Sequence, residues 1–291
     1  MTNRKGIGAY LLITFGTSWT LWEGLFRLGV SVNSPFFQLA ILPGAFAPAL
    51  AAFIVRKWIT CEGFADAGLR LNFRKWPYYV VAWVLPVVAV GCIVISAVLL
   101  RIGAPDFSLV RGLKYLTASV GPMPAPVPPH PWLVVAGFSL PVNAILATPI
   151  LFGEEFGWRG YLQLRLFPDR PVASAIVTGV IWGVWHYPLL LRGYDFPQSR
   201  LAALIVFPVT TVFLSIIFAW LLLKTDSIWS ASFAHAATNA IGGSLSLLLF
   251  GGGASLLFVL YLGILGWIPL GMFSFWITLT GQLKPTNAAI A

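Results

Sequence analysis

The sequence predicts an all-α fold, a polytopic membrane helical bundle with about eight transmembrane helices and both termini in the cytoplasm. Of its 291 residues, 58% are hydrophobic and only 9% are charged, whereas soluble domains carry about a quarter charged residues. The charged residues are also unevenly spread, so that long stretches contain none. Such runs are typical of membrane helices, and the short alternating strands of a β-barrel do not produce them.

Seven charge-free runs define the predicted helices, because about 20 apolar residues cross a bilayer once. The last run, residues 227–283, is long enough for two crossings, and three consecutive glycines at 251–253 are the natural place to divide it. We treat the whole chain, 1–291, as a single integral membrane domain. The eight predicted helices are residues 7–25, 36–55, 78–100, 132–162, 172–191, 201–223, 229–250 and 255–280.

The positions of Lys and Arg predict the orientation, since cytoplasmic loops carry an excess of both. With both termini inside, the inner segments hold twelve of these residues and the outer segments six. The net charge of +9 is therefore a topology bias. It does not indicate a nucleic-acid partner, because the charges are few and lie scattered between apolar runs.

Three further stretches have a structural interpretation. The inner loop at 56–77, with five basic residues between aromatic ones, fits an ordinary positive-inside loop, and an interfacial helix on anionic lipid is the alternative. The outer stretch at 121–132 holds six prolines, so it should be an extended linker. Gly179 and Gly183 form a G-x-x-x-G pair that predicts close helix packing.

Ionisable residues inside membrane helices are costly, so each one is a functional candidate. In the predicted fourth helix, Glu155 and Arg159 lie four residues apart on one stripe, while Glu154 points about 100° away. Arg159 can neutralise Glu155 as a structural ion pair, which leaves Glu154 free to face a cavity. Asn143 falls close to the same face as Glu154 by the same count. A carboxylate in an apolar cavity beside an arginine is suited to act as a general base.

Two more predicted helices carry histidines. Trp182 lies one turn before His186, and His235 lies one turn before Asn239. Each histidine alone is more typical of a packed hydrogen-bonding residue than of a catalyst. Together with Glu154, however, the set provides a base, an acid–base partner and hydrogen-bond donors, which are the groups that peptide hydrolysis by water requires.

These residues form three motifs: E-E-F-G-W-R at 154–159, W-G-V-W-H at 182–186 and H-A-A-T-N at 235–239. The sequence resembles the CAAX prenyl protease 2 and bacteriocin-processing and immunity family, the CPBP or Abi intramembrane proteases, whose motifs are E-E-x-x-x-R, F-x-x-x-H and H-x-x-x-N/D. The first and third motifs match in full, and Trp182 stands where the family has Phe. The core that carries the motifs covers about residues 132–250.

The resemblance implies an endopeptidase that cleaves a membrane-associated peptide or a lipidated protein, the prenylated CAAX type included. It implies that Glu154 and His186 activate water, that His235 and Asn239 form the oxyanion site, and that Glu155 and Arg159 are structural. Members of the family are described both as metalloproteases and as metal-free glutamate proteases. The cofactor therefore stays open: zinc on Glu154, His186 and His235 is compatible with the residues, and so is a metal-free mechanism.

A non-enzymatic membrane protein is the alternative. A proton-coupled transporter or a bacteriocin-immunity scaffold would use the same buried carboxylate and histidines as a proton relay or a contact surface. In either case we expect an integral protein of a prokaryotic plasma membrane. For the protease, we expect an active site that is accessible from the cytoplasm.

Overall fold

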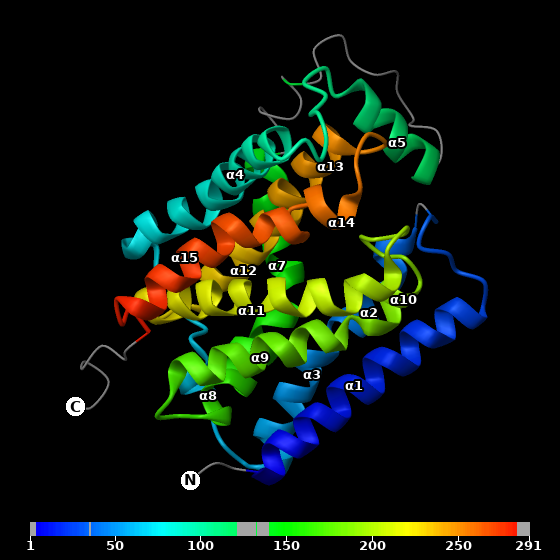
Figure 1. Ribbon diagram of the computed structural model, residues 1–291. Helices are drawn as coiled ribbons and strands as arrows, with labels where there is room; N and C mark the ends of the chain where they lie inside the picture. Colours follow the sequence, from blue (N-terminus) through cyan, green and yellow to red (C-terminus); the bar gives the residue numbers. More distant parts are fainter. Residues whose placement is uncertain (1–3, 35, 121–131, 133–139, 284–291) are drawn as a thin grey trace.

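The computed structural model describes residues 4–34, 36–120, 132 and 140–283, and this part of the chain is helical without a strand. Helices α9 (Pro171–Trp185), α11 (Arg200–Thr225) and α15 (Trp267–Leu279) lie side by side (Figure 1). Behind them, α7 (Leu140–Gly157) packs against α12 (Ile228–Ala237). The all-helical bundle predicted from the apolar runs is confirmed.

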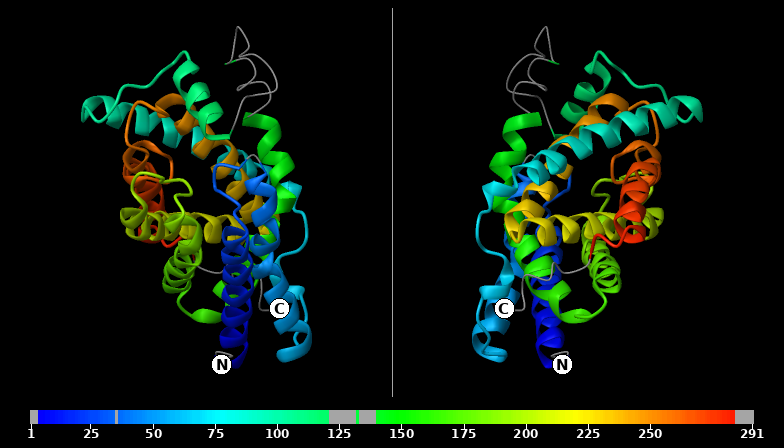
Figure 2. Two further views of the ribbon diagram at one scale, coloured as in Figure 1. Left: turned by 90° about the vertical axis from the view of Figure 1, so that its right-hand side faces the viewer. Right: turned by 90° about the vertical axis from the view of Figure 1, so that its left-hand side faces the viewer.

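The long helix α1 (Arg4–Arg27) runs along one side of the bundle beside α2 (Phe37–Ala45) and α3 (Ala47–Ile54), as the side views in Figure 2 show. On the other side, α4 (Trp76–Leu99) packs against α12 and α15. The remaining segments continue these helices or connect them. They are η1 (Val55–Ile59), η2 (Ala65–Ala67), η3 (Phe73–Lys75), α5 (Val110–Val120), η5 (Trp158–Leu162), α8 (Gln163–Leu166), α10 (Tyr187–Leu191), η6 (Thr238–Gly243), α13 (Ser244–Phe250), α14 (Leu256–Val259) and η7 (Ile264–Gly266).

Each of the eight predicted segments contains helix, but eight membrane crossings are not confirmed. Five segments of the described residues are long and apolar enough to span a bilayer: Phe37–Ile59, Phe73–Leu99, Arg200–Thr225, Ile228–Phe250 and Leu256–Leu279. Helix α9 is apolar but shorter. Helices α1 and α7 are long but carry more polar side chains, among them Glu154 and Glu155.

Prolines and glycines divide several of the predicted helices. The second one breaks at Phe46, just before Pro48, because proline cannot supply the backbone N–H that a continuous helix needs. The last one consists of α14, a turn, η7 and α15. Helix α5 was not predicted, since its polar residues interrupt the apolar pattern. The proposed linker at 121–132 lies outside the described residues except for Trp132.

The close packing predicted for Gly179 and Gly183 is confirmed. A methyl group on Gly179 would lie 2.6 Å from the Cα atom of Val212, and one on Gly183 would lie 2.6 Å from the Cα atom of Pro208. Any larger side chain at these positions would therefore push α9 away from α11. The small residues bring the two backbones together, and this contact positions His186 at the end of α9.

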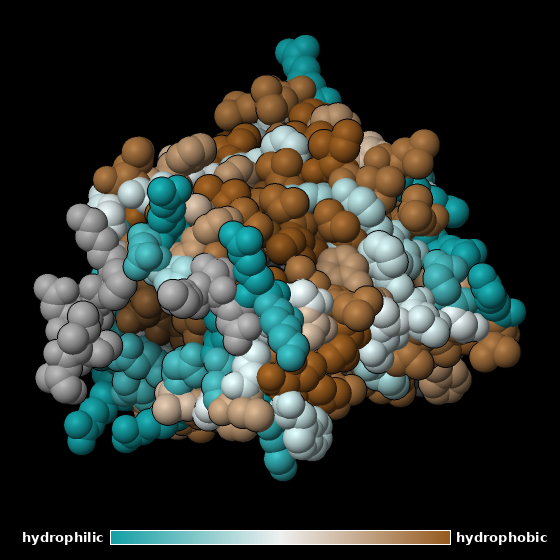
Figure 3. All heavy atoms as spheres, turned by 90° about the horizontal axis from the view of Figure 1, so that it is seen from below, coloured by the Kyte–Doolittle hydropathy of each residue, from teal (hydrophilic) through white to brown (hydrophobic). Residues whose placement is uncertain are grey.

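Large apolar side chains cover much of the outer surface. Leu12, Ile205, Met272 and Leu279 are each at least 70% exposed, and Figure 3 shows apolar side chains over large parts of one face. Exposed apolar area on this scale is not stable in water. It is the expected surface of a protein that contacts lipid.

The loops predicted to lie on the same side of the membrane meet at the same end of the bundle. At one end, Asn72 Nδ2 donates to the Thr225 carbonyl at 2.8 Å, and Arg165 pairs with Glu62 at 3.0 Å. At the other end, Arg192 pairs with Glu23 at 2.9 Å. This grouping agrees with the predicted alternation of inner and outer loops. Which end faces the cytoplasm stays a prediction.

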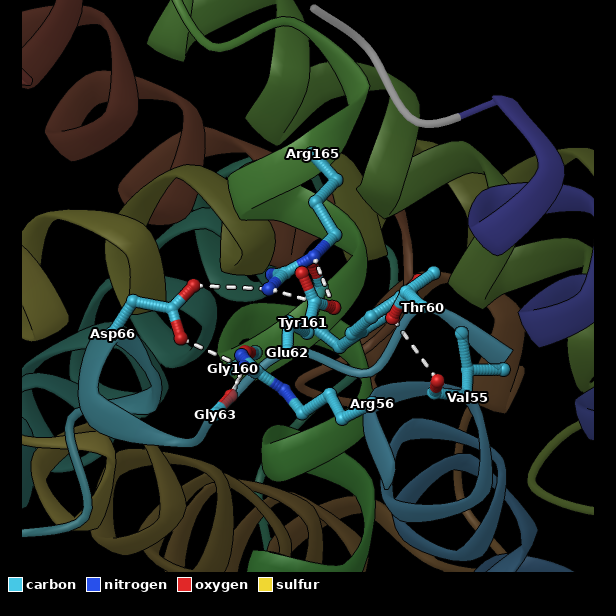
Figure 4. Close-up of polar contacts among 9 residues, drawn as sticks. All are labelled: Val55, Arg56, Thr60, Glu62, Gly63, Asp66, Gly160, Tyr161 and Arg165. Carbon is cyan, nitrogen blue, oxygen red and sulfur yellow. Dashed lines mark hydrogen bonds and ion pairs between the residues drawn. The ribbon is translucent and has the colours of Figure 1, made fainter. Parts of the chain in front are cut away.

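Arg56 ties the loop after η1 to the helix that carries the first motif (Figure 4). Its Nη1 donates to the Gly63 carbonyl at 2.6 Å and pairs with Asp66 at 2.7 Å, while its Nη2 donates to the Gly160 carbonyl of η5 at 2.6 Å. Arg165 pairs with the second oxygen of Asp66 at 3.0 Å. Burial would raise the pKa of Asp66, but Arg56 and Arg165 hold that pKa below its usual value.

Two of the twelve basic residues that were counted in the inner segments are buried arginines, which lowers the charge count used for the topology prediction. Arg56 and Arg159 are fully buried, so neither acts as an exposed inner-loop charge. The other basic residues of the loop, Lys57, Arg70, Arg74 and Lys75, are exposed, as in an ordinary positive-inside loop. Between residues 60 and 72 only the short turn η2 is helical, so this stretch does not form the interfacial helix. The inner segments still hold more exposed Lys and Arg than the outer segments, but the excess is smaller than the count from the sequence.

Cys61 provides a direct test of orientation, because it is exposed in the loop predicted to be cytoplasmic. In a Cys92→Ser variant, a membrane-impermeant maleimide should label Cys61 in inverted membrane vesicles and leave it unlabelled in intact cells. A matched variant with Asn33→Cys, Cys61→Ser and Cys92→Ser carries its cysteine at an exposed position of the opposite end. It should show the reverse pattern, and labelling of Cys61 in intact cells would invert the predicted topology.

Candidate active site

A cavity of about 640 Å³ lies between α7, α9, α11 and α12. Most of its wall is apolar, and it extends past Trp22 of α1 and Ile41 of α2. The polar side chains that line it include all four residues predicted to be catalytic, Glu154, His186, His235 and Asn239, together with Asn143. Residues from three separate motifs therefore line one cavity.

Glu155 forms the centre of a buried ion cluster beside this cavity. Its Oε1 accepts hydrogen bonds from Arg159 Nη1 at 3.0 Å and from His235 Nδ1 at 2.9 Å. All three residues are buried, and the Arg159 guanidinium stacks over the rings of Trp182 at 4.4 Å and Phe218 at 5.1 Å. The first motif is thus joined to the third by a shared carboxylate.

Glu154 takes no part in that ion cluster. Its Oε2 accepts a hydrogen bond from Trp182 Nε1 at 2.8 Å, and the residue lines the cavity. Glu154 and Glu155 are adjacent on α7 and so point in different directions. The structure therefore places one glutamate at a structural ion pair and its neighbour at the cavity wall.

The hydrogen-bond partners fix the tautomers of both histidines. His186 Nδ1 lies 2.9 Å from the Trp182 carbonyl, and His235 Nδ1 lies 2.9 Å from the Glu155 carboxylate. Both partners only accept, so each Nδ1 carries the proton. In the neutral rings, Nε2 is then the acceptor that remains for the cavity. A protonated His235 would donate from Nε2, and Glu155 is the countercharge for that state.

Trp182 contacts both histidines, Glu154 and Arg159. Its ring centroid lies 5.9 Å from that of His186 and 5.0 Å from that of His235. Its indole N–H donates a hydrogen bond to Glu154, and the Arg159 guanidinium stacks on its ring. A phenylalanine would keep the ring contacts but has no hydrogen-bond donor. The sequence indicated only that packing next to His186 differs from the family motif. The hydrogen bond to Glu154 was missed because it joins two helices.

Two turns of π-helix adjoin the motif residues. The segment η5 begins at Trp158, three residues after Glu155, and contains Arg159, and η6 contains Asn239. Such turns are rare and are frequently found at functional sites. Asn239 is exposed toward the cavity on η6, where its amide can donate to a ligand.

The three residues considered as zinc ligands do not form a metal site. Within the described residues, no three His, Cys, Asp or Glu side chains lie together in a way that could hold one ion. The Nδ1 contacts of His186 and His235 would leave Nε2 of each ring for a metal, but the two rings and Glu154 are not grouped closely enough to hold one ion. The arrangement therefore does not fit a zinc ion on Glu154, His186 and His235.

Other cavity residues were also missed. Gln38, Tyr194 and Asp195 line the same space, with Gln38 Nε2 donating to Tyr194 Oη at 3.4 Å. They lie in or beside loops, where polar residues are common, so the sequence did not indicate them as candidate site residues. Only the fold brings them to a cavity that also contains Glu154.

A helical membrane protein with a buried glutamate, two histidines and an amide around one cavity has the groups of an intramembrane hydrolase. Residues 130–241 match the family model of the Rce1-like type II CAAX prenyl endopeptidases. The match covers less than half of the chain, contains all three motifs, and confirms the resemblance to this family of CAAX-type membrane proteases. No curated protein matches the chain.

Proposed function

We propose that this chain is an intramembrane endopeptidase that hydrolyses a peptide bond with activated water. The observation that carries the proposal is the separation of the two glutamates. Glu155 is neutralised by Arg159 and His235, whereas Glu154 lines the cavity together with His186 and Asn239. A purely structural ion cluster would need only Glu155 and would not account for Glu154. A second glutamate at a cavity wall is the arrangement that general-base catalysis needs.

In the proposed reaction, Glu154 takes a proton from water while the water oxygen attacks the scissile carbonyl carbon. Negative charge then develops on the carbonyl oxygen, which Asn239 Nδ2 and a protonated His235 Nε2 stabilise by donating hydrogen bonds. His186 Nε2 accepts a hydrogen bond from the same water and orients it. When the C–N bond breaks, the proton held by Glu154 passes to the leaving amine, so the carboxylate is regenerated.

The proposed substrate is a membrane-associated peptide, including a lipidated one of the prenylated CAAX type. The apolar walls around Ile41, Leu146 and Ile150 suit a lipid chain or a hydrophobic segment. The test uses purified protein in proteoliposomes with matched peptides, with and without a prenyl group. Cleavage in H₂¹⁸O followed by mass spectrometry should show one ¹⁸O in the new carboxylate. The absence of a product from every peptide would favour the non-enzymatic alternatives.

Access to the proposed site from the cytoplasm constrains the orientation. Gln38, Tyr194 and Asp195 belong to the end of the bundle that the charge bias places outside. Cytoplasmic access therefore requires either the opposite orientation or a path between the helices. The labelling of Cys61 described above distinguishes these cases.

Trp182→Phe should lower kcat for peptide cleavage by about tenfold or more and leave KM little changed, because a hydrogen bond to a charged group typically contributes about 1.5 to 3 kcal/mol. The phenyl ring keeps the contacts with both histidines, so the thermal midpoint should change little. Trp276→Phe, on the exposed surface of α15, is the control. An unchanged kcat in the Trp182→Phe variant would show that the indole does not position Glu154 during the reaction.

A further inference from the structure

The cavity has an unbalanced set of charges. Two carboxylates, Glu154 and Asp195, line it, and among the described residues no Lys or Arg does. Arg159 lies nearby but is buried against Glu155 and the ring of Trp182. A carboxylate group of a ligand would therefore find no Lys or Arg to bind it, and a protonated His235 is already paired with Glu155, whereas a cationic group would find an acceptor.

Asp195 is the carboxylate that the proposed reaction does not use. It lies in the loop between α10 and α11, is partly buried, and adopts a left-handed backbone conformation with φ of 60°. Within the part of the chain that the structure describes, no hydrogen bond or ion pair reaches its carboxylate. Burial without a countercharge raises the pKa of Asp195 to about 7. Holding a carboxylate partly out of water without a partner is costly unless something else supplies the partner.

We infer that Asp195 binds a cationic group of the substrate, an ammonium or guanidinium on the peptide, and so selects peptides with a Lys or Arg at one position relative to the cleaved bond. This inference rests on the proposed protease function and adds a substrate class to it. Among the residues that the structure describes, no Lys or Arg lines the cavity to bind a C-terminal carboxylate there. Charge complementarity of this kind determines which peptide binds more than how fast bound peptide reacts.

Asp195→Asn is a suitable variant, because asparagine has the same shape and readily adopts the left-handed conformation. The substrates are neutral membrane peptides in which a single Lys is moved along the sequence, each paired with norleucine at the same position. Each peptide is made with a free and with an acetylated amino terminus, which separates a side-chain ammonium from the terminal amine. The readout is the ratio of kcat/KM for Lys over norleucine, in proteoliposomes.

We expect a Lys preference of about tenfold at one position for the unmodified protein, carried mainly by KM. In Asp195→Asn the ratio should fall to about one. Asp169→Asn, which removes an exposed carboxylate at the opposite end of the bundle, should keep the tenfold ratio. A Lys-to-norleucine ratio of about one, together with faster cleavage of the free peptides than of the acetylated ones, would assign the cation to the terminal amine and overturn the Lys or Arg selection.

Equal Lys-to-norleucine ratios in the unmodified protein and in Asp195→Asn would overturn the inference while leaving the protease function intact. If the unmodified protein cleaves none of the peptides, the proposed function fails. Binding of fluorescent peptides then tests the inference independently. A Kd for the Lys peptide that is the same with Asp195 and with Asn at this position would overturn it.

Discussion

Glu154→Gln should lower kcat for peptide cleavage by about 10³-fold, within the range that removal of a general base typically costs. The amide keeps the shape of the side chain, and its oxygen can still accept the hydrogen bond from Trp182 Nε1. It cannot take a proton from water, so the attacking oxygen stays a weak nucleophile. The measurement is single-turnover cleavage in proteoliposomes, which isolates the chemical step from product release.

The control for this variant is Glu23→Gln. Glu23 is a partly exposed glutamate paired with Arg192 at the surface, so its removal tests the loss of a carboxylate outside the cavity. It should retain cleavage, with an unchanged KM. Residual cleavage above about a tenth of the normal rate in Glu154→Gln would contradict a general-base role for Glu154.

Glu155→Gln should lower the free energy of unfolding by about 3 kcal/mol, because removing one partner of a buried ion pair leaves the other charge uncompensated. Arg159 and Glu155 are both fully buried, and Glu155 also anchors His235. In a chain of this size, such a loss lowers the thermal midpoint by about 5 °C. The midpoint is measured in detergent by intrinsic fluorescence.

A double variant separates charge from packing. Glu155→Gln with Arg159→Met removes both charges and puts an apolar side chain against Trp182 and Phe218, so part of the lost stability should return. Cleavage should not return with it, since His235 still lacks its carboxylate. A single Glu155→Gln variant as stable as the unmodified protein would mean that Arg159 is compensated by another group.

The sequence predicted most of what depends on local patterns. Apolar runs located the helices, and the four-residue spacing of Glu155 and Arg159 placed both on one stripe, which the structure closes as an ion pair at 3.0 Å. The different direction of Glu154 followed from the same geometry. The helix breaks at prolines and glycines were not predicted, because an apolar run does not show where a helix ends. The amphipathic helix α5 was not predicted either, because its polar residues interrupt the apolar pattern.

The particular side-chain contacts between helices could not be predicted. The hydrogen bond from Trp182 to Glu154 and the position of Asp195 on the cavity wall depend on how α7, α9 and the loop after α10 meet. The sequence placed Arg56 among the exposed charges of an inner loop. In the structure it is buried and binds Gly63, Asp66 and Gly160. These interactions join residues far apart in the chain, and a single sequence contains no record of them.

The two π-helical turns have a consequence for insertions and deletions. A π turn holds one more residue than the α-helical turn it replaces, so deleting one residue from η5 or η6 can restore a regular helix without breaking it. Because that turn completes the same rotation with one residue more, the deletion would leave the helix beyond it facing in nearly the same direction. The protein could therefore keep its helices and its membrane insertion while the residues within the turn, Arg159 in η5 or Asn239 in η6, moved relative to their partners. These turns are thus places where a change in length alone could silence the site.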